Sequence, residues 1–133
     1  MKHKAILLID DDEDDQLIFI DAIKEVNPGL VCLAADNGGD AYLQLESSSP
    51  APSLIFLDLN MPVMNGFEFL ERIKKSDRFK NIPVVIYTTS DSPLDKKNTI
   101  DAGAVLFFTK TADFKLLKRK LTEILQNDFY TPI

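Results

Sequence analysis

The sequence predicts an α/β protein in which five strands alternate with five helices. Short, continuous apolar runs recur along the chain, and after each of them the apolar residues fall at helical spacing instead. Strict alternation of strands and helices requires crossover connections, so we expect parallel strands with helices on both faces of the sheet. The 133 residues fit a single domain over 1–133, without a second domain, an internal repeat or a linker.

Five runs are predicted strands because apolar residues dominate them: 5–9, 30–35, 54–59, 82–87 and 105–108. The central run lies between Pro52 and Pro62 and is interrupted only by Asp58. A run of this kind is typical of a parallel strand that is buried on both faces. Pro83 stands near the start of its strand, where the missing N–H is tolerated.

Helices are predicted after the strands at 12–26, around 41–45, and at 66–75, 93–103 and 112–126. In the first, the apolar residues at helical spacing are Leu17, Ile18, Ile20, Ala22, Ile23 and Val26. Asp12 to Asp15 occupy its first turn, where carboxylates suit the helix dipole. Pro93 fits the first position of its helix. Asp36 to Gly39 is predicted to be a turn.

Composition and charge narrow the possible functions. No apolar run is long enough to span a membrane and the N-terminus lacks a signal peptide, so we expect a cytoplasmic protein without a membrane partner. The single Cys32 permits no internal disulfide and is expected to be a small buried hydrophobe. The first 71 residues carry a net charge of −11 and the rest +5, but the pI of about 4.7 argues against direct nucleic-acid binding.

Polar side chains follow the predicted strands where each strand ends. Asp10 and Asp11 follow the first strand, Asp58 ends the third, Thr88 follows the fourth and Lys110 the fifth. The carboxyl ends of parallel strands form one edge of the sheet, where ligands bind. Carboxylates that converge there repel one another unless a cation intervenes, and Mg²⁺ takes oxygen ligands of this kind. Each residue alone also has a simpler explanation, such as Asp58 capping the following turn.

These residue types suit phosphoryl transfer. A carboxylate is a known nucleophile that forms an aspartyl phosphate. A lysine supplies a positive charge for phosphate, and a threonine hydroxyl donates to a phosphoryl oxygen. With Mg²⁺ neutralising charge at the transferred group, little other machinery is needed.

The motifs resemble the receiver domain of two-component response regulators over Ile6 to Leu125. The similarity is carried by Leu7–Asp11, Leu57–Pro62 with Asn65–Gly66, Pro83–Thr88, Ala102–Ala104, and Phe107 with Lys110. The resemblance implies a flavodoxin-like doubly wound sheet in the strand order 2-1-3-4-5. It also implies that Asp58 is the phosphoacceptor, that Asp11 with Asp10 behind it binds Mg²⁺, and that Asn60 supplies a main-chain carbonyl ligand.

The same resemblance assigns a switch. Thr88 is the hydroxyl that senses the phosphoryl group, Lys110 is its charge partner, and Phe107 is the aromatic switch residue. Thr111 stands where the family usually has proline, which leaves the path of the Lys110 loop open. Phenylalanine in place of the commoner tyrosine removes a hydroxyl, so we expect the Phe107 ring to be largely buried even without phosphate.

The leading function is therefore a phosphoacceptor receiver that accepts phosphate from a histidine kinase or a histidine phosphotransfer protein. The expected output surface is the face of the fourth helix, fifth strand and fifth helix, which carries Lys96, Lys97, Lys115, Lys118 and Lys120. It would bind a downstream protein or form a phosphorylation-dependent homodimer, and an ordinary solvated basic face is the alternative interpretation.

Two other function classes share parts of the pattern. A Mg²⁺-dependent phosphohydrolase with an aspartyl nucleophile usually has a second Asp two residues later, where this chain has Asn60. An FMN-binding electron carrier on the same fold conflicts with the acidic run from Asp10 to Asp15, which would repel the cofactor phosphate.

Overall fold

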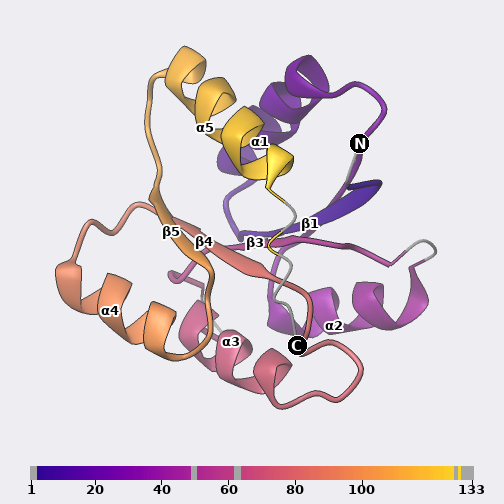
Figure 1. Cartoon of the computed structure of the whole chain (residues 1–133), viewed down its shortest axis with the longest axis vertical. Helices are drawn as coiled ribbons and strands as arrows, with labels where there is room; N and C mark the ends of the chain where they lie inside the picture. The colour runs from indigo at the N-terminus through magenta and orange to yellow at the C-terminus, as the bar shows by residue number, and fades with distance from the viewer. Residues whose placement is uncertain (1–2, 49–50, 62–63, 128, 130–133) are drawn as a thin grey trace.

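The computed structural model describes residues 3–48, 51–61, 64–127 and 129. Its elements alternate without exception: β1 (Ala5–Ile9), α1 (Glu13–Val26), β2 (Val31–Ala35), α2 (Gly38–Ser47), β3 (Ile55–Leu57), α3 (Gly66–Lys74), β4 (Val84–Thr88), α4 (Pro93–Asp101), β5 (Leu106–Thr109) and α5 (Phe114–Gln126). The strands form one parallel sheet in the order β2-β1-β3-β4-β5 (Figure 1). The predicted flavodoxin-like fold is confirmed.

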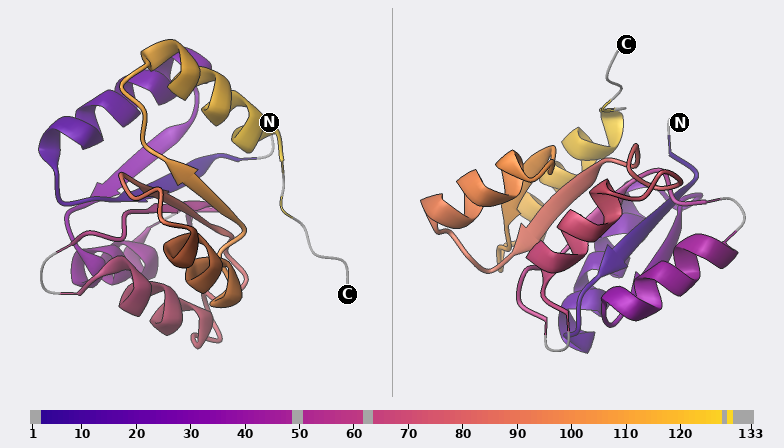
Figure 2. Two further views of the ribbon diagram at one scale, coloured as in Figure 1. Left: turned by 90° about the vertical axis from the view of Figure 1, so that its left-hand side faces the viewer. Right: turned by 90° about the horizontal axis from the view of Figure 1, so that it is seen from below.

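Helices cover both faces of the sheet. α1 and α5 lie on one face, and α2, α3 and α4 lie on the other (Figures 1 and 2). Alternate residues of β1 enter the two cores: Ile6 and Leu8 pack with residues of α1 and α5, while Leu7 and Ile9 pack with residues of α2 and α3. The apolar runs are continuous because both faces of the central strands are buried.

One predicted turn was wrong for a local reason. The turn predicted at Asp36 to Gly39 is the start of α2, because the Asn37 side chain caps the helix by accepting from the Asp40 N–H at 2.9 Å. A Cβ at Gly38 would lie 2.8 Å from the Met64 sulfur, so a larger residue there would require the Met64 side chain to move. α4 ends at Asp101, close to the predicted end near Gly103, and Gly103 follows the capping residue at a φ of +113°.

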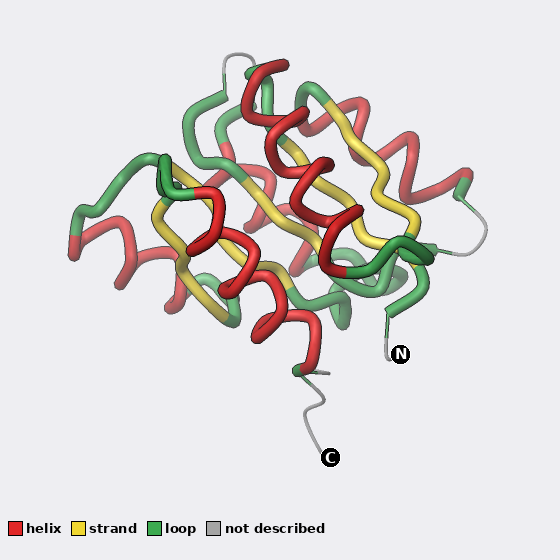
Figure 3. Tube along the Cα trace, turned by 90° about the horizontal axis from the view of Figure 1, so that it is seen from above, coloured by secondary structure: helices red, strands yellow, loops and turns green. Residues whose placement is uncertain are grey.

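The two edges of the sheet are less covered than its centre. Leu106 on β5 is 37% exposed, and among the described residues of α4 only Thr99 is buried. In the trace of Figure 3, helices lie in front of and behind the strands. Cys32 on the opposite edge strand is half-buried, and burial raises the pKa of its thiol to about 12. This agrees with the interpretation of Cys32 as a packing residue rather than a reactive thiol.

No helix in the described part of the chain is long and apolar enough to cross a membrane. Pro62, in one of the motifs, and the tail from Tyr130 to Ile133 lie outside the described residues.

Candidate site at the carboxyl ends of the strands

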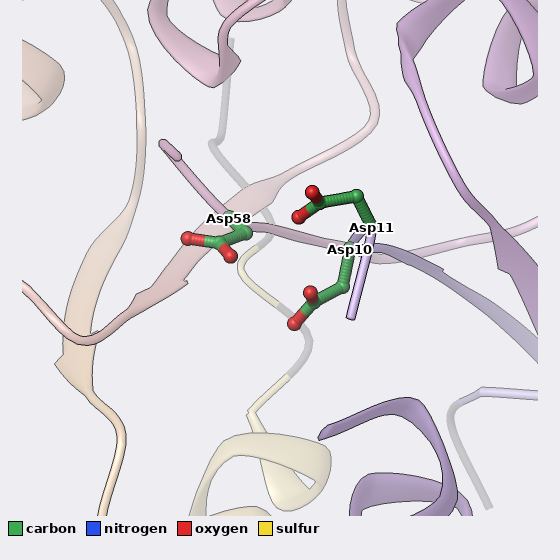
Figure 4. Close-up of side chains that lie close together, drawn as sticks. All are labelled: Asp10, Asp11 and Asp58. Carbon is green, nitrogen blue, oxygen red and sulfur yellow. The ribbon is translucent and has the colours of Figure 1, made fainter. Parts of the chain in front are cut away.

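Three carboxylates meet at the carboxyl ends of β1 and β3. The pairing of Ile9 with Leu57 makes the residues that follow them, Asp10 and Asp58, neighbours. One carboxylate oxygen each from Asp10, Asp11 and Asp58 lies within 4.8 Å of the others (Figure 4). Asp10 is fully buried, Asp58 is nearly so, and Asp11 is exposed. The predicted convergence of carboxylates is therefore present, with one of them open to solvent.

Backbone groups hold the two buried carboxylates in place. Asp10 Oδ1 accepts from the Asp12 N–H at 3.0 Å, and Asp58 Oδ1 accepts from the Asn60 N–H at 3.2 Å. The Asp58 N–H itself donates to Ile9 O at 3.0 Å, which ties β3 to β1 at this point. These bonds leave Oδ2 of each aspartate for other partners, and both are thereby oriented toward the same space.

Gly66 allows the loop after β3 to fold tightly against the site. A Cβ at this position would lie 2.2 Å from the carbonyl oxygen of Asp58, a distance that no side chain tolerates. The Gly66 N–H donates to Leu59 O at 3.1 Å, and α3 starts at the same residue with Asn65 as its cap. The glycine of the Asn65–Gly66 motif therefore lets helix α3 start directly beside Asp58.

Lys110 extends into the acidic cluster from the loop after the edge strand β5. Its ammonium lies 2.7 Å from Asp10 Oδ2, 2.8 Å from Asp15 Oδ2 and 3.2 Å from Asp58 Oδ2. The Lys110 N–H donates to Thr88 O at 2.7 Å, which fixes the loop after β5 beside the end of β4. The side chain thus enters the cluster although Thr111 stands in place of the usual proline.

At both Asp10 and Lys110, burial and the neighbouring charges shift the pKa in opposite directions. Burial raises the pKa of Asp10, and the hydrogen bond from Lys110 opposes this only in part. Burial alone would lower the pKa of Lys110, but its hydrogen bonds to Asp10 and Asp15 raise that pKa above its ordinary value. The lysine therefore stays charged, while Asp10 is a carboxylate whose ionised form would gain from a further cation.

Thr88 contributes a buried hydroxyl to this edge. The residue is fully buried, and its Oγ1 has no hydrogen-bond partner in the described part of the chain. Leaving a buried hydroxyl unpaired costs about 1–3 kcal/mol. Because Leu57 pairs with Ile86, Thr88 stands beyond Asp58 on the neighbouring strand. The hydroxyl is a free donor at the same edge of the sheet as the carboxylates.

Phe107 takes a position between solvent and core. It pairs with Ile86 across β4 and β5, and its ring packs against the core cluster on the side of α2 and α3. The ring is half-buried, so the expectation of a largely buried side chain is met only in part. The reason is that β5 is an edge strand with no further strand beside it.

Asp15 belongs to the site although sequence reasoning placed it only at the positive end of the helix dipole. It lies in the first turn of α1, and its backbone N–H donates to the capping residue Asp12 at 3.1 Å. Helix α1 starts at the edge where β1 ends, so a carboxylate in its first turn is able to face the site. The position of Asp15 in this first turn was therefore the feature of the sequence that could have predicted its place in the site.

The oxygen donors suit a hard divalent cation. Asp10, Asp11 and Asp58 present carboxylate oxygens within reach of one another, and hard cations of the magnesium class take carboxylates and water as ligands. Two of the three carboxylates are buried, where an unneutralised charge is costly. The residues present therefore fit a divalent metal ion.

Comparison with known proteins assigns the family. The chain belongs to the response regulator receiver domains, whose family model matches residues 6–122. Phosphorylation and magnesium binding are characteristic of this regulatory family, which receives phosphate from histidine kinases in two-component systems.

The response regulator Rcp1 of Synechocystis sp. (strain PCC 6803) is 33% identical over 117 residues, which cover 84% of this chain and 80% of Rcp1. The chain spans only 13% of another relative, the sensor histidine kinase CheAY of Helicobacter pylori, at 30% identity over 105 residues.

Solved structures agree with this assignment. The phosphorylated cyanobacterial phytochrome response regulator RcpA has a TM-score of 0.83 at 29% identity, with 93% of this chain and 92% of RcpA covered. The Mn²⁺-bound form of Rcp1 has a TM-score of 0.81 at 30% identity, with 98% and 97% covered. The second structure shows that a relative with this fold binds a divalent metal ion.

Proposed function

We propose that this protein is a phosphoacceptor receiver of a two-component phosphorelay, in which Asp58 is phosphorylated in a Mg²⁺-dependent reaction. The observation that carries the proposal is the position of Asp58, whose carboxylate lies at the end of a central strand with Lys110 3.2 Å away and the acidic pair beside it. A histidine kinase or a histidine phosphotransfer protein is the donor.

The transfer itself needs few protein groups. A carboxylate oxygen of Asp58 attacks the phosphorus of a phosphohistidine, so that an O–P bond forms while the N–P bond breaks and the imidazole nitrogen leaves with the electron pair. Lys110 offsets the negative charge of the transferred group. Mg²⁺ held by Asp10, Asp11, Asp58 and the main-chain carbonyl of Asn60 would supply the remaining charge neutralisation.

Thr88 supports the second half of the proposal, the switch. Its buried hydroxyl has no partner among the described residues, and a phosphoryl oxygen on Asp58 would offer it an acceptor. A shift of Thr88 would be transmitted to Phe107 and β5, because β4 and β5 pair directly. The output surface is then α4, β5 and α5, which binds a downstream protein or a second copy of this chain.

We infer that the protein acts in the cytoplasm as a regulator rather than as a turnover enzyme. Self-phosphorylation from small donors and slow autodephosphorylation are the only reactions that we assign to it. Asn60 supports this, because it stands where an aspartyl phosphohydrolase has its acid–base aspartate and carries no titratable group.

Mass spectrometry after incubation with acetyl phosphate tests the proposal. We expect a single phosphoryl group on Asp58 in the presence of Mg²⁺, and none when EDTA replaces the metal. Asp58→Asn should remain unmodified, whereas Asp14→Asn, which removes an exposed carboxylate of the same acidic region, should be modified like the wild type. A phosphorylated Asp58→Asn variant would disprove the assignment, and continuous hydrolysis of phosphate esters would indicate an enzyme instead.

A further inference from the structure

Lys110 is shared among three carboxylates, and the phosphoacceptor is not its nearest partner. The ammonium lies 2.7 Å from Asp10 and 2.8 Å from Asp15, but 3.2 Å from Asp58. An ammonium group carries three N–H donors, so these contacts occupy all of them. The side chain is only 9% exposed, which leaves little room for water to replace a partner. Any new anion at Asp58 therefore competes with partners already in place.

Asp15 differs from the other two partners. Asp10 and Asp58 belong to the group that fits a metal ion, whereas Asp15 does not. Its side chain is 32% exposed and comes from helix α1 rather than from the end of a strand. The cap at Asp12 fixes the backbone of Asp15 in the first turn, with its carboxylate toward Lys110. Asp15 has no role in the proposed phosphoryl transfer.

We propose that Asp15 restrains Lys110 and thereby weakens the hold of the site on a phosphoryl group at Asp58. A metal ion held by Asp10 would compete with Lys110 for that carboxylate, which would leave Asp15 as the main competitor of Asp58 for the ammonium. The two carboxylates that contact the same nitrogen, Asp15 and Asp58, lie within about 6 Å of each other, where like charges repel. Asp15 is thus a positioning residue that acts through Lys110, and this role rests on the proposed function of Asp58.

The physical consequence is a shorter-lived phosphorylated state. A phosphoryl group on Asp58 adds negative charge beside Lys110, and a lysine free to turn fully toward it would stabilise it more strongly. Because Asp15 keeps a share of the ammonium, part of that stabilisation is lost. Asp15 lies outside the group of carboxylates that fits a metal ion, so its competition for Lys110 persists after phosphorylation.

The affinity for beryllofluoride, a phosphoryl analogue, measures this competition directly. Fluorine NMR of the bound analogue at saturating Mg²⁺ gives the affinity of each variant. We expect Asp15→Asn to bind it about two- to fivefold more tightly than wild type, the range open to a partly exposed ion pair.

Two matched variants separate the role from a general charge effect. Asp14→Asn removes the same charge from the same turn of α1, and in the described part of the chain Asp14 makes no ion pair, so its affinity should change by less than about twofold. Asp15→Glu keeps a carboxylate able to reach Lys110 and should behave like wild type. Asp15→Ser offers a second way to remove the charge if the asparagine variant is poorly folded.

The outcomes that overturn the proposal are distinct. Equal effects of Asp15→Asn and Asp14→Asn would mean that Asp15 acts only through the general negative charge of this region. Weaker binding in Asp15→Asn would mean that Asp15 aims Lys110 at the phosphoryl group, the reverse of a restraint. If wild-type protein does not bind beryllofluoride, or binds it as well after Asp58→Asn, the proposed function itself fails, whereas normal wild-type binding with unchanged variants rejects only the role of Asp15.

Discussion

The strands at the centre of the sheet are fully buried, whereas the edge strand β5 is partly exposed. Every residue of β1 and β3 is buried, and these strands end in the acidic site. β5 is partly exposed along its whole length, and the helix beside it, α4, buries only Thr99 among its described residues. The carboxylates therefore lie on a rigid support, while Lys110 and Phe107 belong to a region with less packing to resist movement.

Truncating one large side chain in each region tests that contrast most strongly. Phe56 on β3 is fully buried and contacts Phe19 edge-to-face at 4.9 Å between ring centroids. We expect Phe56→Ala to lower the free energy of unfolding by about 3–5 kcal/mol. Leu106→Ala on the exposed side of β5 should cost less than about 1 kcal/mol. Urea denaturation measures both, and similar losses would mean that the β5 edge is as firmly packed as the centre.

Metal binding should have the next largest effect, an increase in the stability of the folded protein. Mg²⁺ at about 100 times its dissociation constant adds about 2.7 kcal/mol to the free energy of unfolding, provided that the unfolded chain does not bind it. The melting temperature should therefore rise by several degrees in wild type and not in Asp11→Asn. Thermal denaturation with and without EDTA measures this, and an unchanged wild-type melting temperature would contradict the metal site.

Without metal, Asp10→Asn should instead be more stable than wild type at neutral pH. Burial raises the pKa of Asp10 above 3.8, so the folded state binds its proton more tightly than the unfolded state does. Ionising Asp10 therefore costs stability above the raised pKa, and this cost disappears as the pH falls through that pKa toward 3.8. Lys110 keeps Asp15 and Asp58 as partners in the variant. A gain from Asp10→Asn that is independent of pH would reject this explanation.

The same contrast explains how much the sequence could predict. The order of elements and the converging residues Asp10, Asp11, Asp58 and Lys110 follow from apolar runs and from the geometry of parallel sheets. Which face of a helix is buried was harder to see: Leu17 and Ile18 match the helical period of α1 but are exposed, while Phe19 is fully buried.

The contact of Lys110 with its third partner, Asp15, also could not be predicted from the sequence. The contact between Asp15 and Lys110 joins residues 95 positions apart, and its existence depends on how α1 starts beside the loop after β5. A helix-dipole argument explains a carboxylate in this turn equally well. Only tertiary placement distinguishes the two roles.

Charge reversal on the proposed output surface should have a smaller effect that concerns association alone. Lys96 and Lys115 are exposed on α4 and α5, whereas Lys118 is already paired with Glu25 of α1 at 3.0 Å. We expect Lys96→Glu and Lys115→Glu to weaken phosphorylation-dependent partner binding or dimerisation, with stability changed by less than about 0.5 kcal/mol. Sedimentation of protein treated with beryllofluoride measures the dimer.

Lys4→Glu is the matched control because it reverses an exposed charge just before β1, at the opposite end of the sheet from the acidic site. If all three reversals leave partner binding and dimerisation intact, the lysines form an ordinary solvated face.

Phe107→Tyr should give the smallest change in stability and the clearest test of the β5 edge as a switch. The half-buried ring is held neither fully in the core nor fully in water, so the added hydroxyl shifts its preference outward. Burying a whole phenylalanine is worth about 1.5–3 kcal/mol, so a half-buried ring sits within about 1.5 kcal/mol of exposure. A shift of about 1.4 kcal/mol changes a two-state population tenfold.

A switch residue and a packing residue then respond differently to Phe107→Tyr. If the ring reports the state of Thr88, the variant should alter the affinity of the phosphorylated protein for its partner while the unphosphorylated protein unfolds at nearly the same urea concentration. If the ring only fills space beside Ile86, its pairing residue on β4, stability should change and phosphorylation-dependent binding should not. Because β5 is an edge strand with little covering it, we expect the first result: the loosely packed region can move its ring at low cost, which the rigid centre of the sheet cannot do.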